Sequence, residues 1–179
     1  GLLYDNGRII FRSRHKELVE MVRRELDSGH TIAKHPKKNS YWIEFRNSIL
    51  YSKLEESGLG KPKAERIFPE IPEEYMRHFV RGFIDASANA ESVDGVFVGI
   101  DISFAQNRAF LESFNAALVK YADTGDKIVQ TTRFPYYEAN KLAYKRQDSL
   151  KIRDFIYRDL DLILEEGLYL PSLRDILCS

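Results

Sequence analysis

The order of predicted strands and helices occurs twice along the chain, and this internal repeat constrains the fold more than any other feature. The first copy predicts a strand at 8–13, a helix at 16–26, a hairpin of 31–34 and 41–45, and a helix at 48–56. The second copy predicts a strand at 96–104, a helix at 108–121, a hairpin of 127–133 and 136–144, and a helix at 149–165. Alternating apolar residues support the strands, and apolar spacings of three and four support the helices. The repeat therefore predicts an α+β protein of two similar halves.

A short apolar helix rich in small residues, at 79–89, opens the second copy. It follows Pro72-Glu73-Glu74, where proline is tolerated in a first turn and acidic residues favour the helix dipole. Gly82, Ala86 and Ala88 are small enough to let another helix approach closely, and we expect the helix to break just after Asp85. Taken alone, the segment is equally consistent with an ordinary amphipathic core helix.

Residues 81–89, Arg-Gly-Phe-Ile-Asp-Ala-Ser-Ala-Asn, resemble the motif helix of the LAGLIDADG homing endonucleases. The family pattern is Gly-apolar-apolar-Asp-Ala/Gly-Asp/Glu-Gly, so Gly82, Asp85, Ala86 and Ala88 match helix-packing positions, with Asp85 in a structural or capping role. The resemblance implies two pseudo-symmetric αββαββα repeats, of the single-chain two-repeat type. Their antiparallel sheets would form a DNA-binding saddle over a long, asymmetric site, with the two motif helices at the seam.

The resemblance also implies Mg²⁺-dependent phosphodiester hydrolysis, in which the last acidic residue of each motif helix holds the metal against the scissile phosphate. Ser87 stands where the second motif should carry that acid. A neutral hydroxyl is a poor ligand for a hard cation. The sequence therefore predicts that no metal site is intact in this chain, and that the protein is inactive or at most nicks DNA. Glu91 and Asp94 follow the motif and could approach a metal, but neither stands at the expected position.

The first copy shows no motif helix. Asp5-Asn6-Gly7 between two apolar pairs indicates a tight hairpin turn, because Asn-Gly readily adopts positive φ angles. We expect the first motif helix to lie upstream of Gly1 or to come from another chain. The alternative places Asn6 at the catalytic position of a helix that starts at Gly1, which would lack the turns needed for packing. The predicted domains are a first repeat at 1–60, a linker at 61–72 and a second repeat at 73–179.

Both predicted hairpins are basic, although the net charge of the chain is zero. Residues 31–46 and 127–146 carry an excess of Lys and Arg, whereas 154–166 are acidic and should face away from a polyanion. A two-stranded ribbon fits the major groove of duplex DNA, where Arg and Lys suit guanine or phosphate and Gln and Asn suit adenine. The predicted DNA contacts are Arg8, Arg12, Arg14, Lys34, Lys37, Lys38, Tyr41, Lys127, Gln130, Thr132, Arg133, Tyr137, Asn140 and Lys141.

Two basic residues at matching ends of the fourth strand of each copy, Arg46 and Lys145, are candidates for balancing charge in a transition state. The resemblance implies this role. The four histidines lack metal-ligand spacing, and no Gly-rich phosphate loop or nucleophile elbow is present.

Cys178 is the only cysteine, which excludes a disulfide framework and favours an intracellular setting, either the cytoplasm or an organelle matrix. No apolar run approaches the length of a membrane span. The predicted protein is a monomer, unless another chain supplies the first motif helix, and its predicted partner is double-stranded DNA. Its origin would be an intron or an intein. The alternative function is a catalytically dead DNA-binding regulator or an intron RNA maturase.

Overall fold

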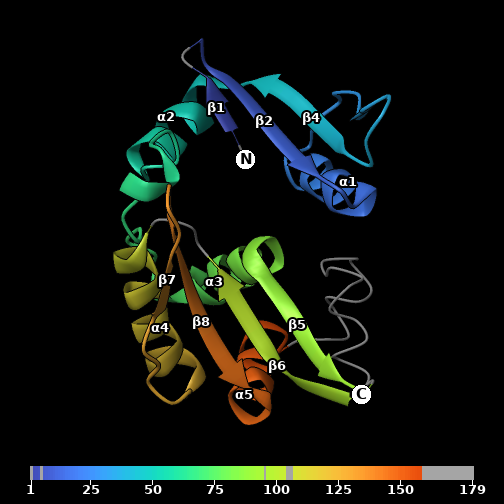
Figure 1. Ribbon diagram of the computed structural model, residues 1–179. Coiled ribbons are helices and arrows are strands. Elements are labelled where there is room, and N and C mark those ends of the chain that lie inside the picture. Colours follow the sequence, from blue (N-terminus) through green and yellow to red (C-terminus); the bar gives the residue numbers. More distant parts are fainter. Residues whose placement is uncertain (1, 5, 95, 104–106, 159–179) are drawn as a thin grey trace. The chain divides into compact units, whose positions relative to one another are not determined.

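The computed structural model describes residues 2–4, 6–94, 96–103 and 107–158. These residues form two compact units, one ending at Pro62 and the other beginning at Lys63. The boundary falls inside the predicted linker 61–72. Each unit contains one four-stranded antiparallel sheet, and Figure 1 shows the strands of both sheets as arrows.

The first unit is a sheet with the spatial order β1-β2-β4-β3 and two helices. Its elements are β1 (Leu2–Tyr4), β2 (Arg8–Ser13), α1 (Lys16–Glu25), β3 (Ala33–Lys34), β4 (Tyr41–Arg46) and α2 (Ser48–Glu56). The predicted turn between β1 and β2 is confirmed: Gly7 has a φ of 76°, and its N–H donates to the carbonyl of Tyr4 at 3.0 Å. Glycine carries no steric penalty in that conformation.

The core of the first unit lies between one face of the sheet and its helices. Ile9, Ile43 and Phe45 are buried together with Val19 of α1, and Leu50 and Leu54 of α2 pack against the same cluster. Asn47 begins α2 as its N-cap, because its side-chain oxygen accepts the N–H of Leu50 at 2.9 Å. The opposite face of the sheet is therefore free of α1 and α2.

The second unit repeats this plan after an additional helix at its start. Its sheet has the order β5-β6-β8-β7, so its four strands are arranged in the same order, counted along the chain, as those of the first sheet. The elements are α3 (Glu73–Ser87), β5 (Ala88–Val93), β6 (Val96–Ser103), α4 (Arg108–Ala122), β7 (Gln130–Arg133), β8 (Glu138–Lys145) and α5 (Arg146–Ile156), and a short 3-10 turn (Lys63–Glu65) precedes them. The predicted α+β fold with two repeated antiparallel sheets is confirmed.

The end of the motif helix differs from the prediction. Helix α3 continues past Asp85 to Ser87, and Ala88 and Asn89 belong to strand β5 instead of the helix. This strand was not predicted from its own residues, because Ala88-Asn-Ala-Glu-Ser has few β-branched or aromatic side chains. Its pairing with β6, from Ala88↔Ile102 to Val93↔Val96, stabilises it in place of local propensity.

Helix α5 also begins earlier than predicted, at Arg146, and is described to Ile156. The rest of the predicted helix at 149–165, the last residue of the predicted strand at 96–104 and the end of the predicted second repeat lie outside the described residues. None of the described helices is both long and apolar enough to cross a membrane.

Helix α3 is fixed in the second unit by aromatic packing. The ring of Phe83 lies 4.6 Å from that of Phe114 in α4, and the ring of Phe79 lies 5.4 Å from that of Phe68 in the preceding segment. The side-chain amide of Asn107 donates to the carbonyls of Lys63 and Arg66, at 2.8 and 2.6 Å. These contacts hold the connecting segment and the motif helix against α4.

Candidate nucleic-acid interface

The face of the first sheet opposite its core carries arginine and aromatic side chains. Successive residues of a strand point to opposite faces, so the burial of Ile9, Ile43 and Phe45 places their neighbours on the other face. We call this the first open face. Its members on β2 and β4 are Arg8, Arg12, Trp42, Glu44 and Arg46, together with Ile10, which is itself buried.

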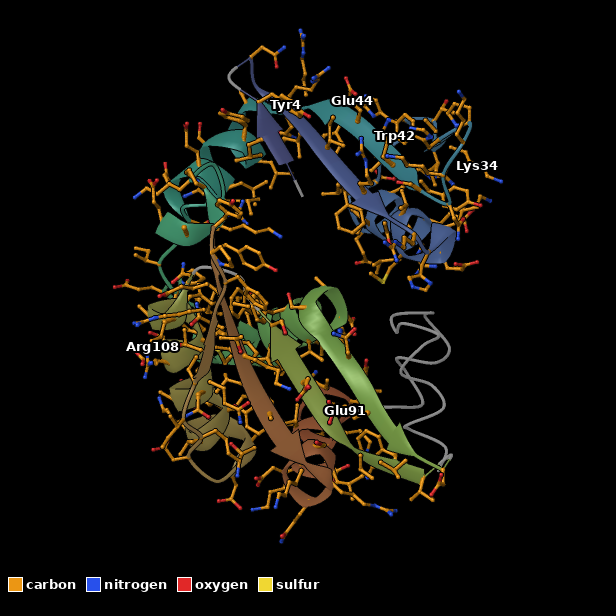
Figure 2. All side chains as sticks on the ribbon, in the orientation of Figure 1. Tyr4, Lys34, Trp42, Glu44, Glu91 and Arg108 are labelled. Atoms are coloured by element: carbon orange, nitrogen blue, oxygen red, sulfur yellow. The ribbon has the colours of Figure 1, made fainter. Side chains whose placement is uncertain are left out.

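Side-chain contacts order the arginines of the first open face. The guanidinium of Arg8 lies 4.3 Å from the centre of the Tyr4 ring and 3.2 Å from a carboxylate oxygen of Glu44. The guanidinium of Arg12 lies 5.5 Å from the centre of the Trp42 ring. Figure 2 labels Tyr4, Trp42 and Glu44 on this sheet. Each guanidinium thus lies against an aromatic ring. Arg8 donates from Nη1 to Glu44, and its Nε is buried.

The corresponding face of the second sheet is polar and mixed in charge. Ile100, Ile102, Leu142 and Tyr144 are buried toward the helices, so the residues that alternate with them lie on the second open face. The strand register places the following residues on it: Asn89, Glu91, Gly99, Asp101, Ser103, Gln130, Thr132, Lys141, Ala143 and Lys145.

An acidic pair and a lysine meet in the middle of the second open face. The ammonium of Lys141 lies 2.5 Å from a carboxylate oxygen of the buried Asp101. Glu91 hydrogen-bonds to Asp101 from the neighbouring strand β5, and this hydrogen bond and the charge of the Asp101 carboxylate raise the pKa of Glu91. The hydrogen bond with Asp101 likewise raises the pKa of Lys141. The charges of these three side chains therefore interact on this face.

A hollow of about 580 Å³ opens beside this cluster. Glu91, Asp101 and Lys145 are among its lining residues. Gly99 lies in one row of the sheet with Glu91 on β5 and Lys145 on β8. A Cβ at Gly99 would collide with the backbone carbonyl of Tyr144, so this position requires glycine. Figure 2 labels Glu91 on β5.

The end of α3 carries Asp85 and Ser87, the two motif positions to which the sequence assigned roles. Ser87 is the last residue of the helix and is half-buried. Asp85 accepts a hydrogen bond from the Tyr157 hydroxyl at 3.3 Å, and burial raises its pKa to about 6 although Arg81 opposes the shift. Asp85 thus links α3 to the end of α5, which is a structural role and not a cap of its own helix.

Gly82 and Ala86, two of the predicted packing positions, lie on α3, one turn apart. Ala88 lies in β5 and so does not belong to this helical face. Arg46 and Lys145 are the last residues of β4 and β8, as predicted from the repeat. Their proposed role in charge balance stays a prediction.

The structure places four predicted DNA contacts away from the open faces. Asn140 is 2 % exposed and accepts a hydrogen bond from the hydroxyl of Thr131 at 2.7 Å, so its amide is not available on the surface. Tyr41 packs against the core of the first unit. Lys34 is paired with Tyr41 in the strand register, so it lies on the same face of the sheet as Tyr41. Lys127 forms a 2.7 Å ion pair with Asp148 at the start of α5. The excess of basic and polar residues in the sequence of the hairpins could not show on which face of the sheet each of these side chains lies.

The remaining predicted contacts divide between the faces and the turns. Arg8, Arg12, Gln130, Thr132 and Lys141 lie on the open faces. Arg14 is exposed just after β2, and Lys37 and Lys38 are exposed in the turn between β3 and β4. Arg133 and Tyr137 lie at the end of the β7–β8 hairpin, where Arg133 forms a 2.9 Å ion pair with Glu138.

Sequence reasoning missed Asp101, Glu91 as its partner, and Trp42. Asp101 interrupts the apolar run of β6 between Ile100 and Ile102, and a charge at such a position is expected to have a polar or charged partner. Trp42 alternates with Tyr41 and Ile43, so only the strand register separates the ring on the open face from the core.

Comparisons with known proteins support the architecture. No protein-family model and no curated protein matches the chain. Solved structures do match: mesophilic variants of the homing endonuclease I-DmoI are 14% identical, with 86% of this chain and 84% of that chain covered and a TM-score of 0.51. A variant of I-DmoI in complex with its target DNA, nicked in the coding strand and in the presence of Mn, is 13% identical over 86% of this chain and 84% of that chain, also at 0.51.

The I-LtrWI LAGLIDADG homing endonuclease bound to target DNA is 12% identical, with 84% of this chain and 70% of that chain covered and a TM-score of 0.46. At these identities the likeness concerns the fold. The two repeated sheets, the motif helix α3 before the second of them and the I-DmoI match agree on one architecture. The chain has the two-repeat fold of the LAGLIDADG homing endonucleases.

Proposed function

We propose that this chain binds double-stranded DNA at a long, asymmetric site through the open faces of its two sheets. The observation that carries the proposal is the same strand order in both units, with the helix-covered core on one face of each sheet and most of the sheet's charged and polar side chains on the other. A two-stranded ribbon fits the major groove, where side chains on one face reach the base edges.

Asymmetry of the site follows from the differences between the two open faces. The first face offers Arg8, Arg12 and Arg46, which suit guanine and phosphate. At the row where Arg8 pairs with Arg46, the second sheet has Gly99 paired with Lys145. Gln130 on β7 suits adenine. Equivalent strands therefore present different donors and acceptors, and a palindromic site would not satisfy both.

DNA cleavage is not supported at the second motif. Mg²⁺ would need a carboxylate near the end of α3, where Ser87 offers only a neutral hydroxyl. Among the residues that the structure describes, no three His, Cys, Asp or Glu side chains gather to hold a metal. The carboxylate of Asp101 already forms an ion pair with Lys141. These residues do not fit the metal, and we propose that this chain alone binds DNA without making double-strand breaks.

Similar structures support DNA as the partner. I-DmoI, whose fold this chain shares, is described in complex with its target DNA. We propose that one chain supplies both halves of the interface, with residues 61–72 as the linker between them, so that one protein molecule binds one duplex.

Selection of bound duplexes from a library with a randomised core tests this function. The expected result is an enriched asymmetric sequence that gives a 1:1 gel shift. A supercoiled plasmid carrying it should stay uncut in Mg²⁺ and in Mn²⁺, and structured RNA should not compete. Failure to enrich any duplex would refute DNA recognition, a linear plasmid would refute the loss of cleavage, and RNA competition would favour a maturase.

A further inference from the structure

The turn that joins β7 to β8 is an ordered aromatic surface, which we call the aromatic tip (residues 134–137). The Phe134 N–H donates to the carbonyl of Tyr137 at 2.9 Å, and the two rings stack with centroids 4.6 Å apart at 19°. The ion pair of Arg133 with Glu138 closes the hairpin beneath them. Pro135 further limits the turn. The aromatic tip is therefore formed before any partner binds.

The rings of the aromatic tip are exposed to solvent. Tyr136 is 96 % exposed, Tyr137 48 % and Phe134 44 %. Exposed apolar residues that gather at one place mark an interaction surface, whereas single ones do not. A tyrosine ring also presents an apolar face and a hydroxyl donor, so it can stack on one group and hydrogen-bond to another.

The equivalent turn of the first sheet has a different chemistry. Residues 35–40 join β3 to β4 and are closed in the same way, by the His35 N–H donating to the carbonyl of Ser40 at 2.9 Å. Proline is the second residue of both turns, Pro36 and Pro135. In place of the aromatic pair stand Lys37 and Lys38, both exposed. We call this turn the basic tip.

Each tip continues a ribbon that carries residues of the proposed interface. On β7 and β8, Gln130, Thr132 and Lys141 lie on the second open face, and the aromatic tip follows at the end of the same hairpin. A ribbon lying in the major groove brings its end turn to the groove wall and the neighbouring sugars and bases. Rigid rings at that place can pack on a deoxyribose or, where a base step is partly unstacked, on the exposed face of a base.

We propose that the two hairpin tips contact different parts of one duplex by different chemistry: the aromatic tip by stacking of Tyr136 and Tyr137 on bases or sugars, and the basic tip by pairing of Lys37 and Lys38 with phosphates. The inference rests on the proposed DNA binding. The end of the site at the basic tip would then be recognised largely by charge. The end at the aromatic tip would be recognised largely by contact with uncharged groups. Only the first of these should depend strongly on salt, because binding of lysine to phosphate releases counterions.

The test compares Tyr136→Ala with the double variant Lys37→Ala/Lys38→Ala, using the duplex selected by the full chain. Val119→Ala is the control, because Val119 is exposed on α4, which lies on the helix-covered side of the second sheet. Binding is measured over a series of salt concentrations. Tyr136→Ala should weaken binding roughly tenfold with an unchanged salt slope. The double variant should reduce the slope by about 0.9 for each phosphate that is no longer neutralised.

Fluorescence of 2-aminopurine, placed at successive positions of the flanks, gives an independent measurement. One flank position should change in fluorescence with the wild-type chain and should lose that change with Tyr136→Ala. If Tyr136→Ala binds as tightly as the control with the same fluorescence, the tip proposal is overturned while DNA binding stands. If it instead alters self-association of the protein without changing DNA affinity, the occupant is a second copy and the proposal is also overturned. If no duplex is selected, both proposals fail.

Discussion

The Tyr157 hydroxyl donates a hydrogen bond to Oδ1 of Asp85 across 3.3 Å, joining the end of α5 to the last turn of α3. Asp85 lies two residues before Ser87, where the family pattern expects the metal-binding acid. Burial raises the pKa of Asp85 to about 6, even though the neighbouring Arg81 favours the charged form. The motif helix thus carries a buried, hydrogen-bonded carboxylate close to the position at which the family pattern expects the metal-binding acid.

The stability of the protein should depend on the charge of Asp85. Its pKa is higher in the folded state than in the unfolded state, so the folded state binds more protons between about pH 4 and 6. Stability from this group is present at acid pH and is lost as the pH rises through about 6. The shift corresponds to a difference on the order of 2 to 3 kcal/mol. Urea unfolding of Asp85→Asn across this range should show a smaller pH dependence than the wild type.

Tyr157→Phe is the matched control for that measurement. It removes the hydroxyl that donates to the ionised carboxylate and keeps the buried ring, so the pKa of Asp85 should rise further. The unfolding free energy at neutral pH should fall, and its pH dependence should grow instead of shrinking. Equal pH profiles for the wild type and both variants would show that Asp85 does not titrate in this range.

Much of the fold could be predicted because the repeat and the apolar periodicity are local signals. Helix α2 and strand β2 begin and end at the predicted residues. Strand β5 could not be predicted, since Ala88-Asn-Ala-Glu-Ser forms a strand through pairing with β6 and not through its own propensity. The residues of the candidate interface were harder to predict than the strands and helices. Asn140 and Lys141 are neighbours of similar polarity, and only the strand register shows that one is buried and the other is on the open face.

A carboxylate at position 87 should supply the charged metal ligand that the family pattern places there. We expect Ser87→Asp to nick the selected duplex in Mg²⁺ or Mn²⁺, because a charged oxygen ligand at the end of α3 holds a hard cation far better than a hydroxyl. Ser87→Asn is the control of similar size without the charge. The measurement is conversion of supercoiled plasmid to open circle. Binding without nicking by the aspartate variant would mean that Ser87 is misplaced or that a first motif helix is essential.

DNA affinity should rise as the pH falls through the pKa of Glu91, which is raised above the usual value for a glutamate. Protonation of Glu91 removes a negative charge from the second open face, where Asp101 and Lys141 already form an ion pair. Fluorescence anisotropy with the wild type at several pH values measures the effect. Glu91→Gln keeps a hydrogen bond to Asp101 without the titration, so its affinity should be higher at neutral pH and nearly constant. An unchanged pH profile in Glu91→Gln would contradict this role.

Gly99→Ala should disrupt the second sheet. A methyl group there would collide with the backbone carbonyl of Tyr144, which forces β6 and β8 apart. Overpacking of this kind costs about 1–3 kcal/mol. Gly29→Ala is the control, since no atom of the described residues lies within 4 Å of the added carbon. Thermal unfolding compares the two, and equal melting temperatures would show that the sheet opens at Gly99 without cost.

Lys145 should contribute charge to DNA binding. Lys145→Met keeps most of the side-chain volume, and it should reduce the slope of log Kd against log salt by about 0.9 if Lys145 neutralises one phosphate. Lys53→Met removes an exposed charge from α2, which covers the core side of the first sheet, and should leave the slope unchanged. A similar reduction in both variants would mean that the effect comes from total charge and not from position.

The most direct test of the central claim is the affinity of the full chain for its selected duplex, compared with a duplex of the same length and composition in scrambled order. Anisotropy titrations at about 150 mM salt suppress much of the nonspecific attraction to phosphate. Sequence-specific recognition by the two open faces predicts a preference of at least about a hundredfold for the selected duplex, since specific binders typically exceed this ratio. Equal affinity for both duplexes would contradict the proposed function.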